Sequence, residues 1–160
     1  MKSKLKPYAI ILLIFILIFS ASIKASTLNT PSIQVSQYVE YLADIQRRIF
    51  THALQLIFPS SSGQSSSFSS GFDSITKVLN DMSSDIESEL SNANIELGYA
   101  SELRLLLNAI NYIQNSLYEL NLFSQSNNSA DKLMILERYF NFRVYATNTL
   151  TFVTRLLSNS

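Results

Sequence analysis

The chain lacks cysteine and tryptophan, and it has little glycine, proline or histidine. Its 160 residues include no Cys, no Trp, three Gly, three Pro and one His. Without Cys it cannot build a disulfide framework, a thiolate-bound zinc site, an iron–sulfur cluster or a cysteine nucleophile. A single His excludes metal sites that use pairs of histidines, and the few Gly and Pro favour long helices over a turn-rich β-sandwich. This length leaves room for one domain of modest size.

The first 25 residues follow the three-part pattern of a secretory signal peptide. Lysines within residues 2–6 precede an uncharged apolar run, YAIILLIFILIF, at positions 8–19, and small residues follow it. This run of 12 residues is shorter than the ~20 that a transmembrane helix needs. The sequence therefore predicts a signal peptide at residues 1–25, cleaved after Ser22 or Ala25.

An uncleaved signal anchor is the alternative interpretation of this segment. The lysines would then stay in the cytoplasm, and the following domain would lie outside the membrane. Both interpretations predict an exported domain at residues 26–160, secreted in the first case and membrane-anchored in the second. We expect membrane contact only if the N-terminal segment is not cleaved.

Removal of the signal peptide turns a neutral chain into an acidic one. The whole chain has 12 basic and 12 acidic residues, and four of the basic residues lie within residues 1–25. The remainder has 8 basic and 12 acidic residues, a net charge of −4. This balance offers no electrostatic basis for binding nucleic acid or an anionic lipid surface, so we expect neither partner.

The spacing of apolar residues predicts an all-α fold. Apolar residues recur at steps of three, four or seven along four segments. The predicted helices span residues 31–57, 73–97, 102–123 and 130–157. Their similar lengths and amphipathic stripes predict a four-helix bundle as the single domain of residues 26–160.

Each predicted helix has a stripe that we expect to face the core. On the first helix the stripe is Tyr38, Leu42, Ile45, Ile49 and Leu56, and on the second it is Ile75, Leu79, Met82, Ile86, Leu90, Ala93 and Leu97. The third helix has the a/d pattern typical of a coiled coil, formed by Leu103, Leu106, Ile110, Ile113, Leu117 and Leu120. On the fourth helix we expect the core face to be Leu133, Leu136, Phe140, Val144, Val153 and Leu157, with Ile135 and Tyr139 outside it.

The predicted connections differ in character. Residues 60–71 contain eight Ser and two Gly, which predicts a flexible linker. We expect the second and third helices to be separated by a break at residues 98–100, because a compact domain needs the reversal to bury both stripes. A single helix continuous through Gly98 is the alternative, since glycine there costs only about 1 kcal/mol relative to alanine.

Few residues in the chain suggest chemistry. His52 follows Ile49 by three residues, and we interpret it as a partly buried structural histidine because no motif supplies a nucleophile or an orienting partner. Asp81, Asp85 and Glu89 recur at four-residue steps, but the calcium-loop and Glu-x-x-His patterns are absent. We interpret these carboxylates as a solvated acidic face, and we predict no catalytic residue, metal site or cofactor.

Two short motifs concern modification. Asn127 begins an Asn-Asn-Ser triplet and is a candidate N-glycosylation acceptor if the source is a eukaryote. Arg47 and Arg48 form a dibasic pair of the kind that processing proteases cut. We interpret the pair as part of a solvated helix face, with Asp44 and Arg48 at the favourable i, i+4 spacing.

The third and fourth predicted helices have more apolar residues than one stripe needs. Either they are the most buried helices, or one wide face is left for a partner, a second copy or a lipid-like ligand. We predict an exported, non-enzymatic helical module that acts by protein–protein contact, with an unknown protein partner or by self-association. The alternative is a carrier of an apolar small molecule in the bundle core. An enzyme is disfavoured because only His52 and scattered carboxylates are present.

Overall fold

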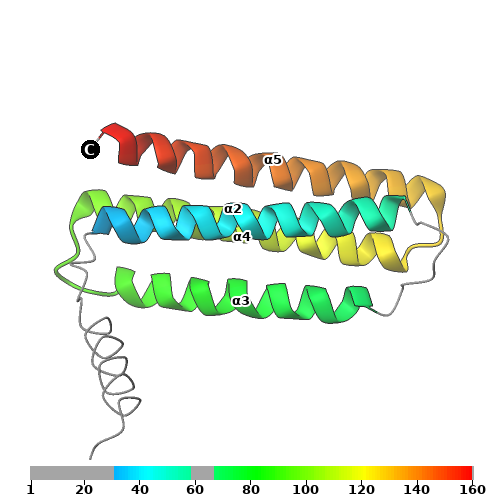
Figure 1. Ribbon diagram of the computed structural model, residues 1–160, viewed down its shortest axis with the longest axis horizontal. Helices are drawn as coiled ribbons and strands as arrows, with labels where there is room; N and C mark the ends of the chain where they lie inside the picture. The colour runs from blue at the N-terminus through cyan, green and yellow to red at the C-terminus, as the bar shows by residue number, and fades with distance from the viewer. Residues whose placement is uncertain (1–30, 59–66, 160) are drawn as a thin grey trace, which may run out of the picture. The chain divides into compact units, whose positions relative to one another are not determined.

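The structure is a bundle of four α-helices (Figure 1). It is a computed structural model that describes residues 31–58 and 67–159, and this part of the chain contains no strand. The helices are α2 (Pro31–Ile57), α3 (Ser67–Leu90), α4 (Leu97–Gln125) and α5 (Ser129–Asn159). The predicted all-α bundle is confirmed. The predicted signal peptide at residues 1–25 lies outside the described residues.

Successive helices of the bundle run in alternating directions, which gives an up-down-up-down topology (Figure 1). The main contacts of α4 are with all three other helices, whereas those of α5 are with α4 and α2 only. Eleven residues of α4 are buried, against five of α5. The centre of the hydrophobic core therefore follows α4.

The helix α2 has the bounds that the sequence predicts. Proline is tolerated at Pro31 because the first N–H of a helix has no intrahelical partner. Leu42, Ile45 and Ile49 are buried, as expected. Tyr38 and Leu56 are only half-buried and pack against the edge of the core.

The bounds of α3 differ from the prediction at both ends. The helix begins at Ser67, inside the predicted linker, and buried Phe72 extends its apolar stripe. It ends at Leu90 because a polar turn follows, in which the Asn94 N–H donates to Asn92 Oδ1 at 3.1 Å. The prediction of a helix to residue 97 is therefore wrong.

The break between α3 and α4 lies earlier than expected. We predicted it at residues 98–100, but Gly98 belongs to the first turn of α4, and residues 91–96 form the connection. Leu97, an expected core residue, is 79% exposed. The Ser-Asn-Ala-Asn sequence after α3 was the turn signal, since short polar side chains hydrogen-bond to nearby backbone groups and compete with helix formation.

The core stripe of α4 is confirmed in full. All six of its predicted residues are buried, and none is more than 4% exposed. The helix continues two residues beyond its predicted end, where the Ser126 N–H donates to the Leu122 carbonyl. A regular a/d pattern therefore identified both the helix and its buried side.

The predicted core face of the last helix is correct at Val153, which is buried, and wrong at three other positions. Leu133, Phe140 and Val144 are 71%, 39% and 50% exposed. The face that α5 does bury consists of Ile135, Tyr139, Ala146, Leu150 and Val153. Apolar residues lie on several sides of α5, so sequence spacing could not select the buried side. The positions of α4 and α2 select it.

Candidate functional site

The most distinctive surface of the bundle is the α5 outer face, which we define as Leu133, Met134, Phe140, Val144, Tyr145 and Phe152. These are six of the twelve large apolar side chains that are exposed among the described residues. The helix α5 lies at the edge of the bundle in Figure 1, and its main contacts with the other described helices are with α4 and α2. A concentration of exposed apolar side chains on one element is typical of an interaction surface.

The α4–α5 seam borders this face and contains one ion pair, in which the carboxylate is buried and the arginine is about half exposed. The rings of Tyr112 and Tyr145 meet across the seam with their centroids 5.5 Å apart. One heptad further along α4, the buried Glu119 carboxylate accepts a hydrogen bond from Arg138 Nε at 2.9 Å. Its second oxygen, Oε2, is buried and has no hydrogen-bond partner. The ring contact and the ion pair therefore hold the two helices in register.

A second feature, which we call the α2–α5 groove, lies between these two helices. Its volume is about 350 Å³. The residues that line it are Val39, Ala43, Gln46, Arg47, Phe50, Arg143, Thr147, Leu150, Thr151 and Thr154. The Thr147 hydroxyl donates to Gln46 Oε1 at 3.0 Å, and the Arg143 guanidinium lies 4.2 Å from the Phe50 ring centroid. Two arginines and no carboxylate line this groove.

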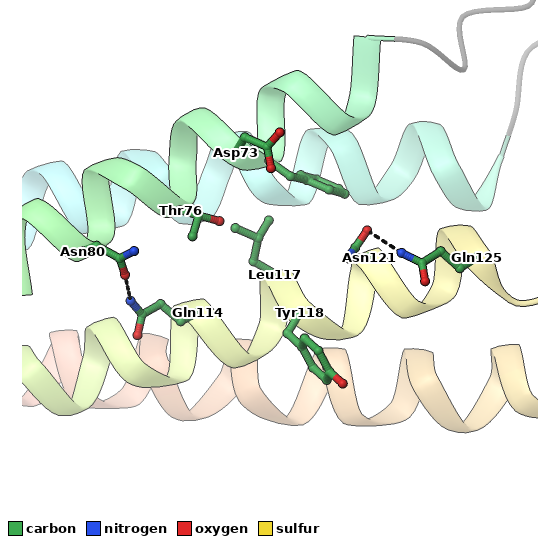
Figure 2. A pocket seen from close by; sticks show the side chains of 9 residues that line it. Asp73, Thr76, Asn80, Gln114, Leu117, Tyr118, Asn121 and Gln125 are labelled. Atoms are coloured by element: carbon green, nitrogen blue, oxygen red, sulfur yellow. Dashed lines mark hydrogen bonds between the residues drawn. The ribbon is translucent and has the colours of Figure 1, made fainter.

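A larger groove, of about 610 Å³, lies between α3 and α4 (Figure 2). Neutral amide side chains surround much of it, and Gln114 Nε2 donates to Asn80 Oδ1 across it at 2.8 Å. Asn121 and Gln125 bond to each other along α4 rather than pointing at a common centre (Figure 2). The amides thus satisfy one another, and Asp73 is the one charged side chain that lines this groove among the described residues.

A polar cluster links three helices at the end of the bundle where α3 finishes. The Glu89 carboxylate accepts hydrogen bonds from Gln34 of α2 and from Tyr99 of α4. Burial and the neighbouring Glu89 carboxylate raise the pKa of Tyr99 above its ordinary value, and burial likewise raises the pKa of Tyr38. This cluster connects helices, and its tyrosines stay protonated at neutral pH, so they are not poised as bases.

The structure separates the residues that we considered for chemistry. His52 is half-buried, and its ring meets the edge of Phe72 with centroids 6.2 Å apart. Of the three aligned carboxylates, Asp81 pairs with Lys77 at 2.6 Å, while Glu89 belongs to the polar cluster. Within the described ranges, no three Asp, Glu or His side chains lie close enough to hold a metal ion.

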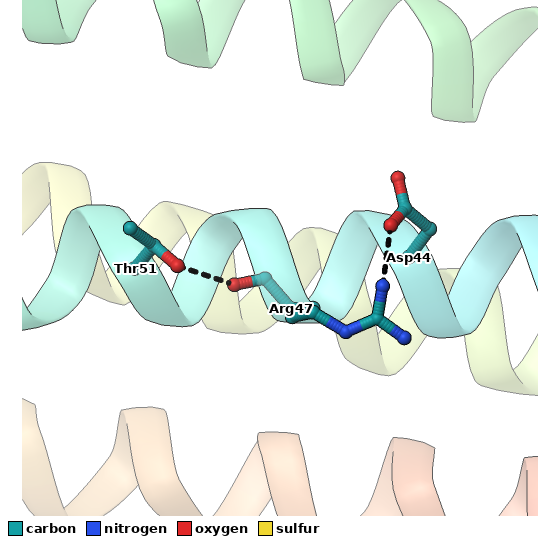
Figure 3. A network of polar contacts seen from close by, with 3 residues as sticks. All are labelled: Asp44, Arg47 and Thr51. Carbon is teal, nitrogen blue, oxygen red and sulfur yellow. Dashed lines mark hydrogen bonds and ion pairs between the residues drawn. The ribbon is translucent and has the colours of Figure 1, made fainter.

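The dibasic motif lies on an exposed side of α2 (Figure 3). Asp44 pairs with Arg47 at 2.7 Å rather than with the predicted Arg48, because the i, i+3 position is also within reach on a helix. The Thr51 hydroxyl donates to the Arg47 carbonyl at 3.1 Å (Figure 3). Such exposed pairs contribute about 0–1 kcal/mol, so this group is a solvated helix face.

The sequon lies in the short turn between α4 and α5. Asn127 is exposed there. The next residue, Asn128, accepts a hydrogen bond from the Ala130 N–H at 2.9 Å and so caps α5. The position of Asn127 is accessible for modification, and glycosylation stays a prediction.

Comparison with known proteins gives no relative from which a role can be transferred. The chain matches no protein-family model, no curated protein and no solved structure. None of the described helices combines the length and the apolar character needed to cross a membrane. The site must therefore be argued from the described residues themselves.

Sequence reasoning missed the α2–α5 groove. Phe50 and Arg143 were not among the candidate site residues. Their contact joins positions 93 residues apart in the chain, so no local spacing could reveal it. An arginine among four aromatic residues at positions 139–145 was the only available signal.

Proposed function

We propose that the protein is an exported, non-enzymatic helical module that binds another protein through the α5 outer face. The observation that carries the proposal is the set of six large apolar side chains exposed on this one helix. Exposed apolar area on a single element is costly in water, and a protein partner removes that cost.

The outer side chains of α5 are not needed for the core of the bundle. The opposite side of the helix already contributes Ile135, Tyr139 and Leu150 to the core. Phe140 and Val144 project on the other side, where their exposed fractions are 39% and 50%. The outer face is therefore available for a partner without loss of the fold.

The chemistry of the described residues supports a binding role over an enzymatic one. His52 lies against an apolar ring, and Asp81 pairs with an exposed lysine. The carrier alternative has weaker support, because the centre of the bundle is occupied by one cluster of buried apolar side chains. Both points favour a function that resides on the surface.

Site-directed photocrosslinking tests the binding proposal. A photoreactive residue replaces exposed Asn148 on the outer side of α5 in the full chain, which is then irradiated in the extracellular fluid of its host. We expect an adduct of defined mass that is lost in the double variant Phe140→Gln/Val144→Ser. The control Tyr118→Gln removes an aromatic residue of α4 that is 60% exposed, more than Phe140 at 39%, and should keep the adduct.

Two outcomes would contradict the binding proposal. One is the absence of any adduct, including one with a second copy of the chain. The other is an adduct that persists in the α5 double variant, which would place the binding surface elsewhere. Circular dichroism of each variant checks that the helices are intact.

Export rests on residues 1–25 and has its own test, the N-terminal residue of the mature protein. Cleavage after Ser22 or Ala25 leaves Ile23 or Ser26 at the N-terminus. We expect one of these by mass spectrometry of the extracellular protein. A Met1 terminus in the membrane fraction indicates the anchored alternative, and an intact chain in the cytosol contradicts export.

A further inference from the structure

The α2–α5 groove has a fixed register, because two contacts align its walls. Phe50 faces Arg143, and one turn along, Gln46 faces Thr147. The helices are antiparallel, so the next turn brings Ala43 opposite Leu150. The groove residues of α2 span positions 39–50, which is about 17 Å of helix.

One end of the groove is cationic. Arg143 and Arg47 both line it. Arg47 already pairs with Asp44 at 2.7 Å, whereas Nε of Arg143 is buried without a hydrogen-bond partner. No acidic side chain lines the groove, although the described ranges contain twelve acidic and only eight basic residues. A buried guanidinium donor without an acceptor, in an acidic domain, indicates a place for an external anion.

The other end of the groove is apolar. Val39, Ala43 and buried Leu150 line it. The hydroxyls of Thr151 and Thr154, which also line the groove, donate to backbone carbonyls of their own helix. The groove volume of about 350 Å³ falls in the range of small-molecule sites, about 300–1,000 Å³. A ligand that satisfies both ends needs a charged head and an apolar body.

We propose that the α2–α5 groove binds a small amphiphile with a single anionic head group. The head lies at Arg143 and Arg47, and the apolar tail runs along Ala43 and Leu150. Guanidinium groups pair with carboxylates and phosphates alike, so the head belongs to either class. This site lies between two helices and is separate from the α5 outer face, so it does not depend on the proposed function.

Isothermal titration of the full chain with matched ten-carbon probes tests the site. The probes are decanoate, decyl phosphate and uncharged decanol, each below its micelle concentration or solubility limit. We expect saturable binding of one molecule per chain for at least one anionic probe, about tenfold tighter or more than for decanol. Acetate and inorganic phosphate, which lack the tail, should bind at least about tenfold more weakly than the matching ten-carbon anion.

Three variants locate the binding. Arg143→Gln removes the guanidinium, and we expect it to weaken binding of the anionic probe by about tenfold or more. Ala43→Phe fills the apolar end at an exposed position and should weaken binding of all the ten-carbon probes. Arg155 lies outside the groove and serves as the control. Arg155→Gln removes a guanidinium there, and the affinity for the anionic probe should stay within about twofold of that of the unmodified chain.

The proposal is overturned by any of three results. These are no saturable binding of either anionic probe, equal affinity for decanol, or an equal loss in the Arg155 and Arg143 variants. If Arg143→Gln does not fold, the Ala43→Phe variant decides the location alone, since binding that survives it lies elsewhere. Thermal unfolding of each variant shows whether it is folded.

Discussion

The helices α4 and α5 are similar in length and rich in apolar residues, yet the structure uses them differently. Eleven residues of α4 are buried, whereas α5 buries five and exposes six large apolar side chains. The difference lies in their neighbours, because α4 packs against three helices and α5 against two. Apolar composition alone therefore does not determine which side chains leave water.

This difference separates a structural helix from a surface helix. Ile113 of α4 is fully buried, so its side chain stabilises the fold. Val144 of α5 is half exposed, so its side chain contributes little to the core. The proposed partner surface and the proposed ligand groove both involve α5, where side chains remain accessible.

The largest expected effect is a contrast between two truncations. Ile113→Ala should lower the free energy of unfolding by about 2–5 kcal/mol, because it removes buried methyl groups and leaves a cavity. Val144→Ala should change it by no more than about 0.5 kcal/mol, since its side chain is already half in water. Urea unfolding of both variants measures the contrast. Equal losses would show that α5 is buried on both sides, for instance by a second copy.

A smaller effect concerns the buried hydroxyl of Tyr139 on α5. This hydroxyl has no hydrogen-bond partner, and burial raises the pKa of Tyr139 to about 12. Tyr139→Phe should therefore stabilise the fold by about 1 kcal/mol at neutral pH, because an unsatisfied polar group leaves the core. Chemical denaturation measures this gain. A clear loss of stability would mean that the hydroxyl has a partner in solution.

The pH dependence of the same variant gives a second readout. A phenol with a raised pKa supplies stability that is present below pH 10.0, its ordinary pKa, and is lost as pH rises towards about 12. The Phe variant lacks this contribution, so its advantage over the unmodified chain should grow between these pH values. An advantage that stays constant would contradict burial of the phenol.

The smallest expected effect concerns Glu102 in the first turns of α4. Burial, and then the neighbouring Glu96 carboxylate, raise the pKa of Glu102 above its ordinary value of 4.5. Stability from this group is thus fully present below pH 4.5 and is lost as pH rises through the raised pKa. Glu102→Gln should be slightly stabilising at pH 7 and neutral at pH 4. Thermal unfolding at both pH values measures the change, and the exposed substitution Glu137→Gln is the control.

Local sequence patterns predicted much of the fold because they report on regular elements. The core stripe of α4 was predicted correctly because it rests on an unbroken repeat of Leu and Ile. The bounds of α2 were predicted correctly because its apolar residues recur at helical steps and proline is tolerated at its first position. The end of α3 was predicted too late, because the apolar spacing continues through Ala93 to Leu97 although a polar turn interrupts the backbone. The spacing of apolar residues does not show where short polar side chains take over the backbone hydrogen bonds that would continue a helix.

The candidate sites were less accessible from sequence. The last helix has more apolar residues than one core stripe needs, which indicated an interaction surface. The sequence did not show which side of the helix forms that surface. Leu133 was assigned to the core and proved to be 71% exposed, while Tyr139 was assigned outside and is fully buried. The Arg143–Phe50 contact could not be predicted, because it depends on the register of two helices far apart in the chain.

The sequence by itself determined that the chain forms amphipathic helices, because a 3.6-residue period and scarce glycine and proline act locally on each segment. It also determined the acidic balance of the residues that follow the predicted signal peptide. Only the tertiary structure decided which side of α5 faces water and which residues of α2 and α5 share a groove. Burial and proximity depend on neighbouring helices, and helix packing is a property of pairs of surfaces rather than of one segment.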